Sequence, residues 1–274
     1  MNKFKLSNEE FENLSQIVFD NIGVNLTNKK KPLIISRLSR RLRQLNLGSF
    51  SEYIELLQSD TDELEIFFNL ITTNVSKFFR EKNHFQYLRN TYLPMIKREG
   101  VKTVKAWSAG CSTGEEPYTL AIVLNEIFDN GQEKIEIIAS DVNTKVLKSA
   151  ARGVYRKEKL TKVPYKLLKK YFYLGTGKNR DLFKVKEDIR NLVSFKVINL
   201  KDADYTFKKP LDIIFCRNVF IYFNKKTQEE VLKKFHQILK NNGRLFLGHS
   251  EKVSRNGGQK SWELCAPTVY RKIE

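Results

Sequence analysis

A strand, a turn of small residues and a helix follow one another between residues 104 and 128, and this segment restricts the fold more than any other. The β-prone stretch 104–107 stops at the turn Ser108-Ala-Gly-Cys-Ser-Thr-Gly114. Two glutamates and a proline then open a run with helical apolar spacing, and these residue types are favoured in a first helical turn. The pattern predicts a βα unit of an open α/β sheet, whose turn lies at the carboxyl end of a strand, where ligands bind.

This turn does not have the pattern of a phosphate-binding loop. It lacks both Gly-x-Gly-x-x-Gly and Gly-Lys-Ser/Thr, and Glu115 and Glu116 would repel a pyrophosphate from the helix amides that attract anions. The glutamates instead suit a cationic ligand, such as a sulfonium or an ammonium. The next strand, 135–141, ends in Asp141, whose carboxylate can accept hydrogen bonds from both hydroxyls of a ribose. Together these features predict a site for S-adenosylmethionine (AdoMet); an ordinary βαβ unit with a chance aspartate is the alternative.

Length, charge and the rarer residue types limit the class of protein. A chain of 274 residues that is 41% hydrophobic can form one large or two ordinary domains, and it lacks the run of about 18 apolar residues that spans a membrane. Three scattered cysteines and three scattered histidines favour neither a disulfide framework nor a metal site, so we expect a reduced, cytoplasmic protein. The net charge of +18 indicates an acidic partner. Nucleic acid, an anionic membrane surface and an acidic protein all fit this charge.

Residues 1–80 are predicted to form a helical domain, which begins at the capping box Ser7-Asn-Glu-Glu10. The predicted helices cover residues 7–23, 33–45, 50–57 and 64–71. The 33–45 helix has one apolar face, and its other face is basic, because the stretch 27–45 contains seven Lys and Arg and no acid. We interpret this basic face as a binding surface; a plain solvated face is the alternative. Its arginines are Arg37, Arg40, Arg41 and Arg43.

Residues 81–274 are predicted to form an AdoMet-binding α/β domain. After a helix over 144–151 the α/β rhythm breaks, and 153–191 is predicted to be an inserted subdomain, a small antiparallel sheet with a helix, built on a hairpin around 174–180. The remaining expected strands are 193–200, 211–218, 244–248, 262–264 and 268–271, with helices over 83–98 and 227–239.

Polar side chains follow four of the predicted parallel strands at their carboxyl ends. Each group alone is weak evidence, since an Arg-Asn pair after a strand is more often a turn than a ligand site. Four groups in one sheet indicate a shared site. The residues are Glu115, Glu116, Asp141, Asn199, Arg217 and Asn218.

Five motifs make the chain similar to the CheR family, the methyltransferases of chemotaxis receptors. They are Thr72-Thr-Asn-Val-Ser-Lys-Phe-Phe-Arg80, Trp107-Ser-Ala-Gly-Cys-Ser-Thr-Gly-Glu-Glu-Pro-Tyr118, Ala139-Ser-Asp-Val-Asn143, Ile213-Ile-Phe-Cys-Arg-Asn-Val-Phe-Ile-Tyr-Phe223 and Leu245-Phe-Leu-Gly-His-Ser-Glu251. The resemblance covers nearly the whole chain. It implies an AdoMet-dependent methyltransferase (Rossmann-like) sheet with an inserted small antiparallel β-subdomain and an all-α N-terminal domain.

The same resemblance implies methyl transfer from AdoMet to glutamate side chains on receptor helices, which yields glutamyl methyl esters and S-adenosylhomocysteine (AdoHcy). Arg80 and Tyr222 would lie near the transferred methyl group, Glu116 against the methionine part of AdoMet, and Asp141 against its ribose. The family usually has threonine at the place of Ser76, which keeps the hydroxyl. The residues implied to contact AdoMet are Asn74, Ser76, Arg80, Glu116, Asp141, Asn199, Leu200, Arg217 and Asn218, with Asn199 and Leu200 on the adenine side.

The implied chemistry fits these residue types. A glutamate carboxylate, with an ordinary pKa of about 4.3, is ionised at neutral pH and needs no general base; Arg80 could hold it by its guanidinium fork and Tyr222 could orient it. Receptor methylation regions are acidic helical bundles, so the basic face would dock them. The turn Gly175-Thr-Gly177 resembles the form of the insert that, in some members, grips the receptor's C-terminal tail peptide. Neither nucleic acid nor membrane insertion is expected.

Two other functions compete with this interpretation. An RNA methyltransferase would explain the charge, but base-amine methylation commonly uses an Asn/Asp-Pro-Pro-Tyr-type motif where this chain has Cys-Arg-Asn-Val, and no aromatic RNA-binding signature stands out. A non-catalytic adaptor would keep the fold and bind receptors only. The intact acidic and Arg-Asn positions argue against it.

Overall fold

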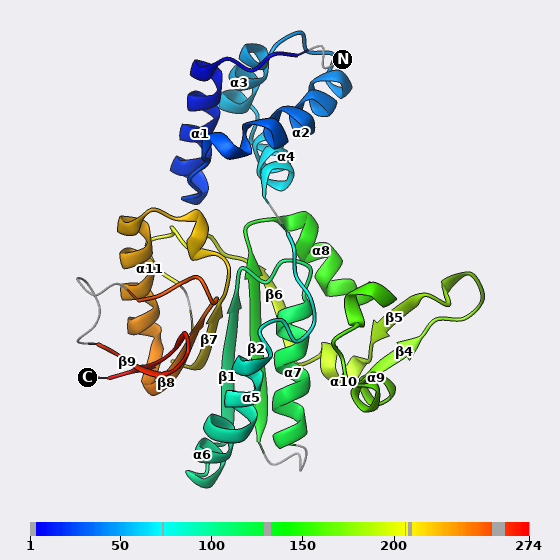
Figure 1. The fold of residues 1–274 in the computed structure, drawn as a ribbon, viewed down its shortest axis with the longest axis vertical. Helices are drawn as coiled ribbons and strands as arrows, with labels where there is room; N and C mark the ends of the chain where they lie inside the picture. Colours follow the sequence, from blue (N-terminus) through cyan, green and yellow to red (C-terminus); the bar gives the residue numbers. More distant parts are fainter. Residues whose placement is uncertain are drawn as a thin grey trace.

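The computed structural model describes residues 4–72, 74–128, 133–205, 207, 210–253 and 261–273. A cap of helices lies above an α/β sheet, and a small second sheet projects from the side of the α/β part (Figure 1). The chain passes from the cap to the sheet through segment 72–81, whose described residues form neither helix nor strand.

The cap has a hydrophobic core of its own, in which Phe50, Tyr53 and Phe67 are fully buried. The predicted capping box is confirmed, because Ser7 Oγ accepts from the Glu10 backbone N at 3.0 Å and the Glu10 carboxylate accepts from the Ser7 N at 2.8 Å. The cap helices are α1 (Asn8–Ile22), α2 (Lys31–Gln44), α3 (Phe50–Ser59) and α4 (Thr61–Ile71), with a 3₁₀ turn at Asn28–Lys30.

The main sheet has the strand order β6-β2-β1-β7-β8-β10-β9. The first five strands of that order are parallel, whereas β10 pairs antiparallel with β8 and β9. The order reverses between β1 and β7, which is the point where open α/β sheets bind ligands. The predicted Rossmann-like sheet is therefore confirmed. Its strands are β1 (Thr103–Ala109), β2 (Lys134–Asp141), β6 (Val193–Val197), β7 (Leu211–Cys216), β8 (Leu239–Leu247), β9 (Trp262–Ala266) and β10 (Val269–Lys272).

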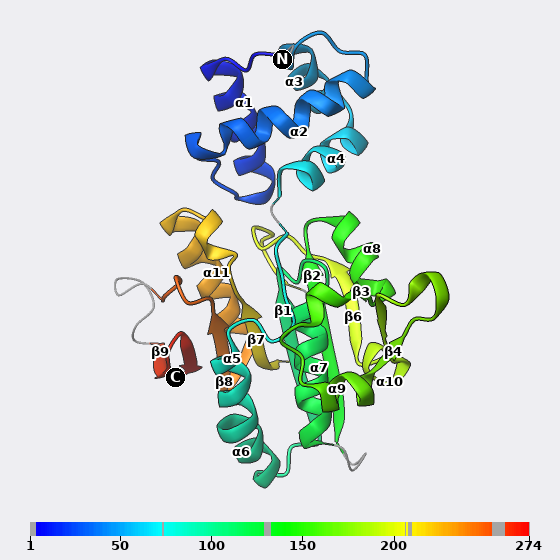
Figure 2. The ribbon, with the colours of Figure 1, turned by 45° about the vertical axis from the view of Figure 1, so that its right-hand side comes forward.

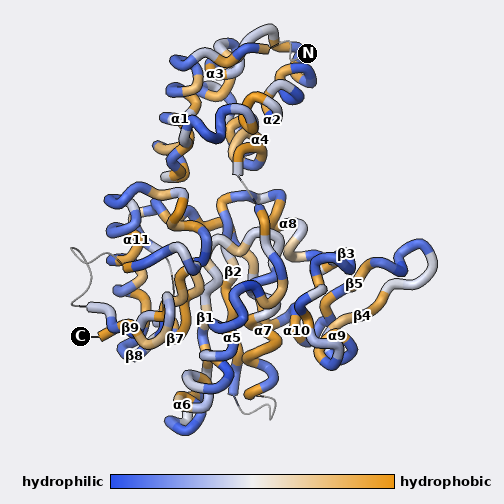
Figure 3. Tube along the Cα trace, viewed as in Figure 1, coloured by the Kyte–Doolittle hydropathy of each residue, from blue (hydrophilic) through white to orange (hydrophobic). Residues whose placement is uncertain are grey.

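Helices cover both faces of this sheet. Side chains of a strand alternate between the two faces, so neighbouring residues enter different cores. Ala106 on β1 joins a core with α7, whereas its neighbour Trp107 joins a second core with α11. Figure 2 shows α7 and α11 on opposite sides of the sheet, and Figure 3 shows α7 as mostly hydrophobic. The helices are α5 (Lys82–Tyr87), α6 (Leu93–Arg98), α7 (Glu115–Ile127), α8 (Thr144–Arg152) and α11 (Lys225–Ile238).

The inserted subdomain is a three-stranded antiparallel sheet of order β3-β5-β4, as predicted. It holds segment 72–81, because Phe78 is fully buried with its ring 4.9 Å from Tyr155 and 5.5 Å from Phe172. The elements are β3 (Val154–Arg156), α9 (Tyr165–Tyr171), β4 (Phe172–Leu174), β5 (Leu182–Val185) and α10 (Glu187–Arg190), with 3₁₀ turns at Lys157–Leu160 and Gly177–Asn179.

Hydrogen bonds fix the cap to the loops after β6 and β7. The Lys201 ammonium donates to two carbonyls in the last turn of α1, those of Phe19 and Asp20, each at 2.8 Å, where the helix dipole favours a cation. The Asn25 backbone N donates to Tyr222 O at 2.7 Å. The cap thus lies over the carboxyl ends of the parallel strands.

Two expected boundaries differ from the structure. The 83–98 helix is divided, because a π-helical turn at Leu88–Tyr92 separates α5 from α6. The strand expected at 244 begins at Leu239, and the Asn-Asn-Gly stretch predicted to end the preceding helix lies inside β8 as an irregularity of its pairing with β7. The stretch 240–243 has no strand-pairing partner on β7 and Asn242 has φ of 62°, so the local turn preference is kept as a bulge within the strand.

Candidate functional site

A cavity of about 200 Å³ lies between the cap and the strand ends. Its walls come from α1 and the turn after it, from segment 72–80, and from the loops after β1, β2, β6 and β7. The sequence predicted that ten residues surround one ligand and the reacting group, and the structure brings all ten to this cavity. They are Asn74, Ser76, Arg80, Glu116, Asp141, Asn199, Leu200, Arg217, Asn218 and Tyr222.

The turn after β1 approaches the loop after β7 closely. Gly110 has φ of 79°, and a Cβ there would lie 2.4 Å from Val219 Cγ2, so glycine is required at this position. Ser112 follows with φ of 51°. Ser112 lines the cavity, while its hydroxyl oxygen is buried and has no hydrogen-bond partner in the described part of the chain. The turn after β1 thus brings two residues with positive φ, Gly110 and Ser112, into the wall of the cavity.

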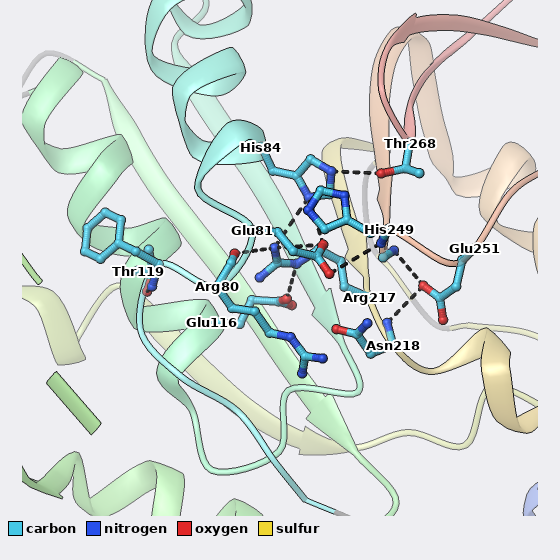
Figure 4. Close-up of polar contacts among 12 residues, drawn as sticks. Arg80, Glu81, His84, Glu116, Thr119, Arg217, Asn218, His249, Glu251 and Thr268 are labelled. Carbon is cyan, nitrogen blue, oxygen red and sulfur yellow. Dashed lines mark hydrogen bonds and ion pairs between the residues drawn. The ribbon is translucent and has the colours of Figure 1, made fainter. Parts of the chain in front are cut away.

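An ion pair between Glu116 and Arg217 forms the floor of the site (Figure 4). One Glu116 oxygen accepts from Arg217 Nε at 2.7 Å, and the other accepts from Ser108 Oγ at 2.7 Å. Arg217 is 6% exposed and Glu116 is 8% exposed. This pair joins α7 to β1 and β7 in a buried environment, where neither charge has water to replace its partner.

The Arg217 guanidinium also holds the end of segment 72–81. Its Nη1 donates to the Arg80 carbonyl at 2.6 Å and lies 3.5 Å from the Glu81 carboxylate. The rings of Phe85 and Phe215 each lie 5.2 Å from its Cζ, at distances that allow cation–π attraction. Arg217 therefore holds the backbone at Arg80 in place.

Asp141 ends β2 and braces the turn after β1. Its carboxylate accepts from the backbone N of Ser112 and of Asn143, each at 2.9 Å. Burial raises the pKa of Asp141 above its ordinary value, although backbone N–H donors oppose that rise. Each carboxylate oxygen has a second lone pair, so the group can still accept from a ligand.

Arg80, Tyr222 and Lys30 all line the cavity. Arg80 Nη1 donates to the Val75 carbonyl at 2.9 Å, and Lys30 Nζ lies 4.2 Å from the centroid of the Tyr222 ring. Burial raises the pKa of the Tyr222 phenol, against the effect of the Arg80 charge. Burial also lowers the pKa of Lys30, which a second cation, Arg37, lowers further.

Asn199, Leu200 and Asn218 complete the wall. Asn199 Nδ2 donates to the Asn21 carbonyl in the cap at 2.6 Å, so its side chain joins the two parts of the protein. Leu200 is buried in the core shared with Trp107. Asn218 has φ of 59°, an uncommon backbone conformation that side chains around it must hold in place.

His84 stands behind Arg217 and was not predicted as a site residue. Its ring is 1% exposed; Nε2 lies 2.9 Å from Thr268 Oγ1, and Nδ1 lies 3.4 Å from Arg217 Nη1 (Figure 4). Burial lowers the pKa of His84 to about 4, and Arg217 and His249 add to this effect, while Glu81 opposes it. The imidazole is neutral at pH 7.

This pKa predicts a loss of stability in mild acid. An unfolded His84 titrates near 6.5, so below that pH the unfolded state binds a proton that the folded state resists until about pH 4. The free energy of unfolding is therefore highest above pH 6.5 and decreases as pH falls, by about 2 kcal/mol between pH 7 and 5. Urea unfolding at both pH values should show a smaller pH effect for His84→Gln than for the wild type. The control Gln237→Ala, at an exposed residue on α11 that does not titrate, should keep the wild-type slope, and equal slopes for all three proteins would contradict the assignment.

The basic helix differs from the sequence expectation of four equivalent arginines. Arg37 donates to the carbonyls of Leu70 and Thr72 at the end of α4, at 2.6 and 3.0 Å, and Arg41 pairs with the buried carboxylate of Glu63. The basic stretch 27–45 contains no acidic residue, but the neighbouring helix α4 supplies Glu63. Arg40 and Arg43 remain exposed, and a second cavity beside α2 is lined by Arg37, Arg40, Arg41, Gln44, Ile66, Leu70 and Lys145.

Sequence reasoning missed several residues of the site. Ser112 and Lys30 line the cavity, and His84 and Glu81 contact Arg217. Ser112 lies in the small-residue turn 108–114 and Lys30 in the basic stretch 27–45, so both belonged to features that the sequence singled out, whereas Glu81 and His84 follow the Arg80 motif without a signal of their own. No group of three or more His, Cys, Asp and Glu within the described ranges is placed to hold a metal ion. Across the same ranges, no helix is both long and apolar enough to cross a bilayer.

Comparison with known proteins gives matches along nearly the whole chain. The family model described as "CheR methyltransferase, all-alpha domain" matches residues 9–72, and that described as "CheR methyltransferase, SAM binding domain" matches residues 74–268. The chain is 42% identical to Chemotaxis protein methyltransferase 2 of Pseudomonas aeruginosa, over 91% of this chain and 88% of that protein. It is 39% identical to Chemotaxis protein methyltransferase of Escherichia coli, over 98% and 92%. The identity to the protein of that name from Borreliella burgdorferi is 38%, over 99% and 98%.

Proposed function

Because the chain belongs to the CheR methyltransferase family, an AdoMet-dependent family with a chemotaxis role, we propose that it methylates glutamate side chains of chemotaxis receptors. The product would be a glutamyl methyl ester, together with AdoHcy. One observation carries the proposal: two carboxylates suited to a cationic donor, those of Glu116 and Asp141, and an arginine suited to an anionic acceptor, Arg80, line one cavity.

The cavity suits AdoMet, which supplies a methyl group on a positively charged sulfur. The Asp141 carboxylate can accept hydrogen bonds from a ligand, and Glu116, which is paired with Arg217, lines the same cavity. The aliphatic side chains Ile22, Val24, Ile71, Val142, Ile198 and Leu200 offer an apolar surface to a planar base. We propose that Asn74, Ser76, Arg80, Glu116, Asp141, Asn199, Leu200, Arg217 and Asn218 hold the cofactor.

Arg80 and Tyr222 would act on the acceptor side. The guanidinium would hold the acceptor carboxylate in a two-pronged hydrogen bond, and the phenol, whose raised pKa keeps it protonated, would donate a hydrogen bond that orients it. A glutamate acceptor is already ionised, so no side chain need take a proton. Because opposite charges on donor and acceptor cancel during transfer, exclusion of water by the cap would favour the reaction, and positioning would supply much of the rest.

We further propose that α2 docks the acidic helices of the receptor. Residues 1–80 carry eleven Lys and Arg against ten Asp and Glu, so the cap is nearly neutral and its basic character is local to α2 and the turn before it. Arg40 and Arg43 are exposed and available to a partner, whereas Arg37 and Arg41 already bind α4. The selection of acidic partners would then rest mainly on the two exposed arginines.

Charge reversal at these two arginines is expected to weaken receptor docking. Arg40→Glu combined with Arg43→Glu should raise KM for receptor by about tenfold or more and leave kcat nearly unchanged, because rim charges act on association. Steady-state assays at two ionic strengths would measure this, and the wild-type activity should fall with salt. The matched control is Lys226→Glu with Lys233→Glu, two exposed lysines on α11. Intact receptor methylation by the α2 variant would refute the docking surface.

The inserted subdomain is proposed to bind the receptor's C-terminal tail peptide. Residues 153–191 carry twelve Lys and Arg against four Asp and Glu, a charge that suits an acidic peptide. The hairpin between β4 and β5 contains the Gly175-Thr-Gly177 turn that carries the family resemblance.

Incubation with a receptor cytoplasmic fragment and methyl-labelled AdoMet tests the proposed function. The label should enter the receptor, map to glutamates by peptide analysis and be released as methanol by mild base, as esters are. Base-stable label in RNA would instead indicate an RNA methyltransferase. A protein that binds receptor but shows no AdoMet binding in calorimetry would be an adaptor.

A further inference from the structure

A buried carboxylate braces the loop that carries three of the proposed site residues. Glu251 is 5% exposed; its Oε2 accepts from the backbone N of Gly248 at 2.6 Å and of Asn218 at 2.9 Å. Its Oε1 accepts from the Ile221 N at 3.3 Å. In the described part of the chain no cation pairs with this carboxylate, so backbone amides supply its contacts (Figure 4).

The braced loop needs this support. It runs from Arg217 at the end of β7 to the 3₁₀ turn Phe220–Tyr222, and Asn218, Ile221 and Tyr222 within it line the cavity. The conformation of Asn218 is strained, since its φ is 59°. Among the described residues its backbone N donates only to Glu251, so loss of this contact would leave the N–H without a protein partner.

The residue that follows β8, Gly248, also packs closely against Asn218. A Cβ at Gly248 would lie 2.7 Å from Asn218 Nδ2 and 2.9 Å from the Asn218 N. The loops after β7 and β8 therefore meet at a distance that only glycine permits, and the Glu251 side chain bridges them.

We propose that Glu251 is a positioning residue for methyl transfer, which fixes the 217–222 loop so that Asn218 meets the cofactor and Tyr222 meets the acceptor. The inference rests on the proposed function for its acceptor half and on the AdoMet site alone for its cofactor half. Its action goes through backbone amides, and it does not touch the reacting atoms.

The test is Glu251→Gln, which keeps the side-chain size but turns an amide NH₂ toward backbone N–H donors. Calorimetry with AdoHcy should show a Kd raised by about tenfold, and receptor assays should show kcat lowered by about tenfold or more, because loop displacement acts on both ligands. A merely structural role would reduce the fraction of binding-competent protein and leave the Kd of that fraction unchanged. Unaltered Kd and kcat in a folded Glu251→Gln protein would overturn the proposal.

Two further variants keep the test decisive. Gly248→Ala strains the same contact without altering the carboxylate and should raise the AdoHcy Kd in the same direction; a wild-type Kd would count against the proposal even if Glu251→Gln failed to fold. Glu229→Gln, an exposed carboxylate on α11, should behave as wild type. Since AdoHcy binding requires no receptor, weakened binding in the variants would support the positioning role even if the receptor substrate proved wrong.

Discussion

Replacement of Arg217 by methionine is expected to lower the free energy of unfolding by about 3–5 kcal/mol, because it leaves the buried carboxylate of Glu116 without its cation. AdoHcy binding should also be lost, since the variant frees Glu116 and the carbonyl of Arg80 from their shared donor. Chemical denaturation and calorimetry would measure the two effects.

Two further variants separate the cost of an unpaired buried charge from the cost of replacing the side chain. Arg271→Met removes a cation whose pair with Glu263 is exposed, so it should leave the free energy of unfolding nearly unchanged. Adding Glu116→Gln to Arg217→Met removes the unpaired charge, so stability should recover in part while binding stays weak. An Arg217→Met protein as stable as the wild type would show that the pair does not support the fold.

Replacement of Arg80 by alanine is expected to lower kcat/KM for receptor methylation by about 10²–10³-fold, the usual effect of losing one donor to the reacting group. The fold should hold, because Arg80 is partly exposed and its side-chain bond to Val75 lies within the same segment. Single-turnover assays with saturating AdoMet would isolate the acceptor-side effect.

Lys77→Ala gives the matched control, since Lys77 is an exposed cation on the same segment. Arg80→Lys should recover only part of the activity, because an ammonium keeps the charge but not the planar fork. An unchanged kcat/KM in Arg80→Ala would remove Arg80 from the mechanism.

The fold was predictable wherever local pattern and tertiary packing agree. The strand, glycine turn and helix around Gly110 form as expected, because a β-prone run, a turn of small residues and a Glu-Glu-Pro helix start are all local signals. The start of β8 was misjudged, since the pairing of Leu239 with Leu211 on β7, which extends the strand across the Asn-Asn-Gly bulge, depends on a strand far away in sequence. Local turn chemistry cannot reveal such a partner.

The site was predictable in its lining and less so in its supports. Glu116, Asp141 and Arg217 follow strand ends, and parallel strands bring such ends together. The partners of Arg37 and Arg41 lie on α4, in the second case through an acid 22 positions away, so a window count of charges took both arginines as free. His84 was missed because a lone histidine beside an apolar residue has no signature until Arg217 is placed against it.

The uneven charge of the inserted subdomain and the cap affects how the molecule would meet an anionic assembly. Almost all of the net positive charge lies on the α/β part and its insert, so an anionic surface attracts that part of the molecule more strongly than the near-neutral cap. That part would therefore approach first in the encounter complex, and the cap would follow. Ionic strength would then act first on the frequency of productive collisions and only later on the rate of turnover.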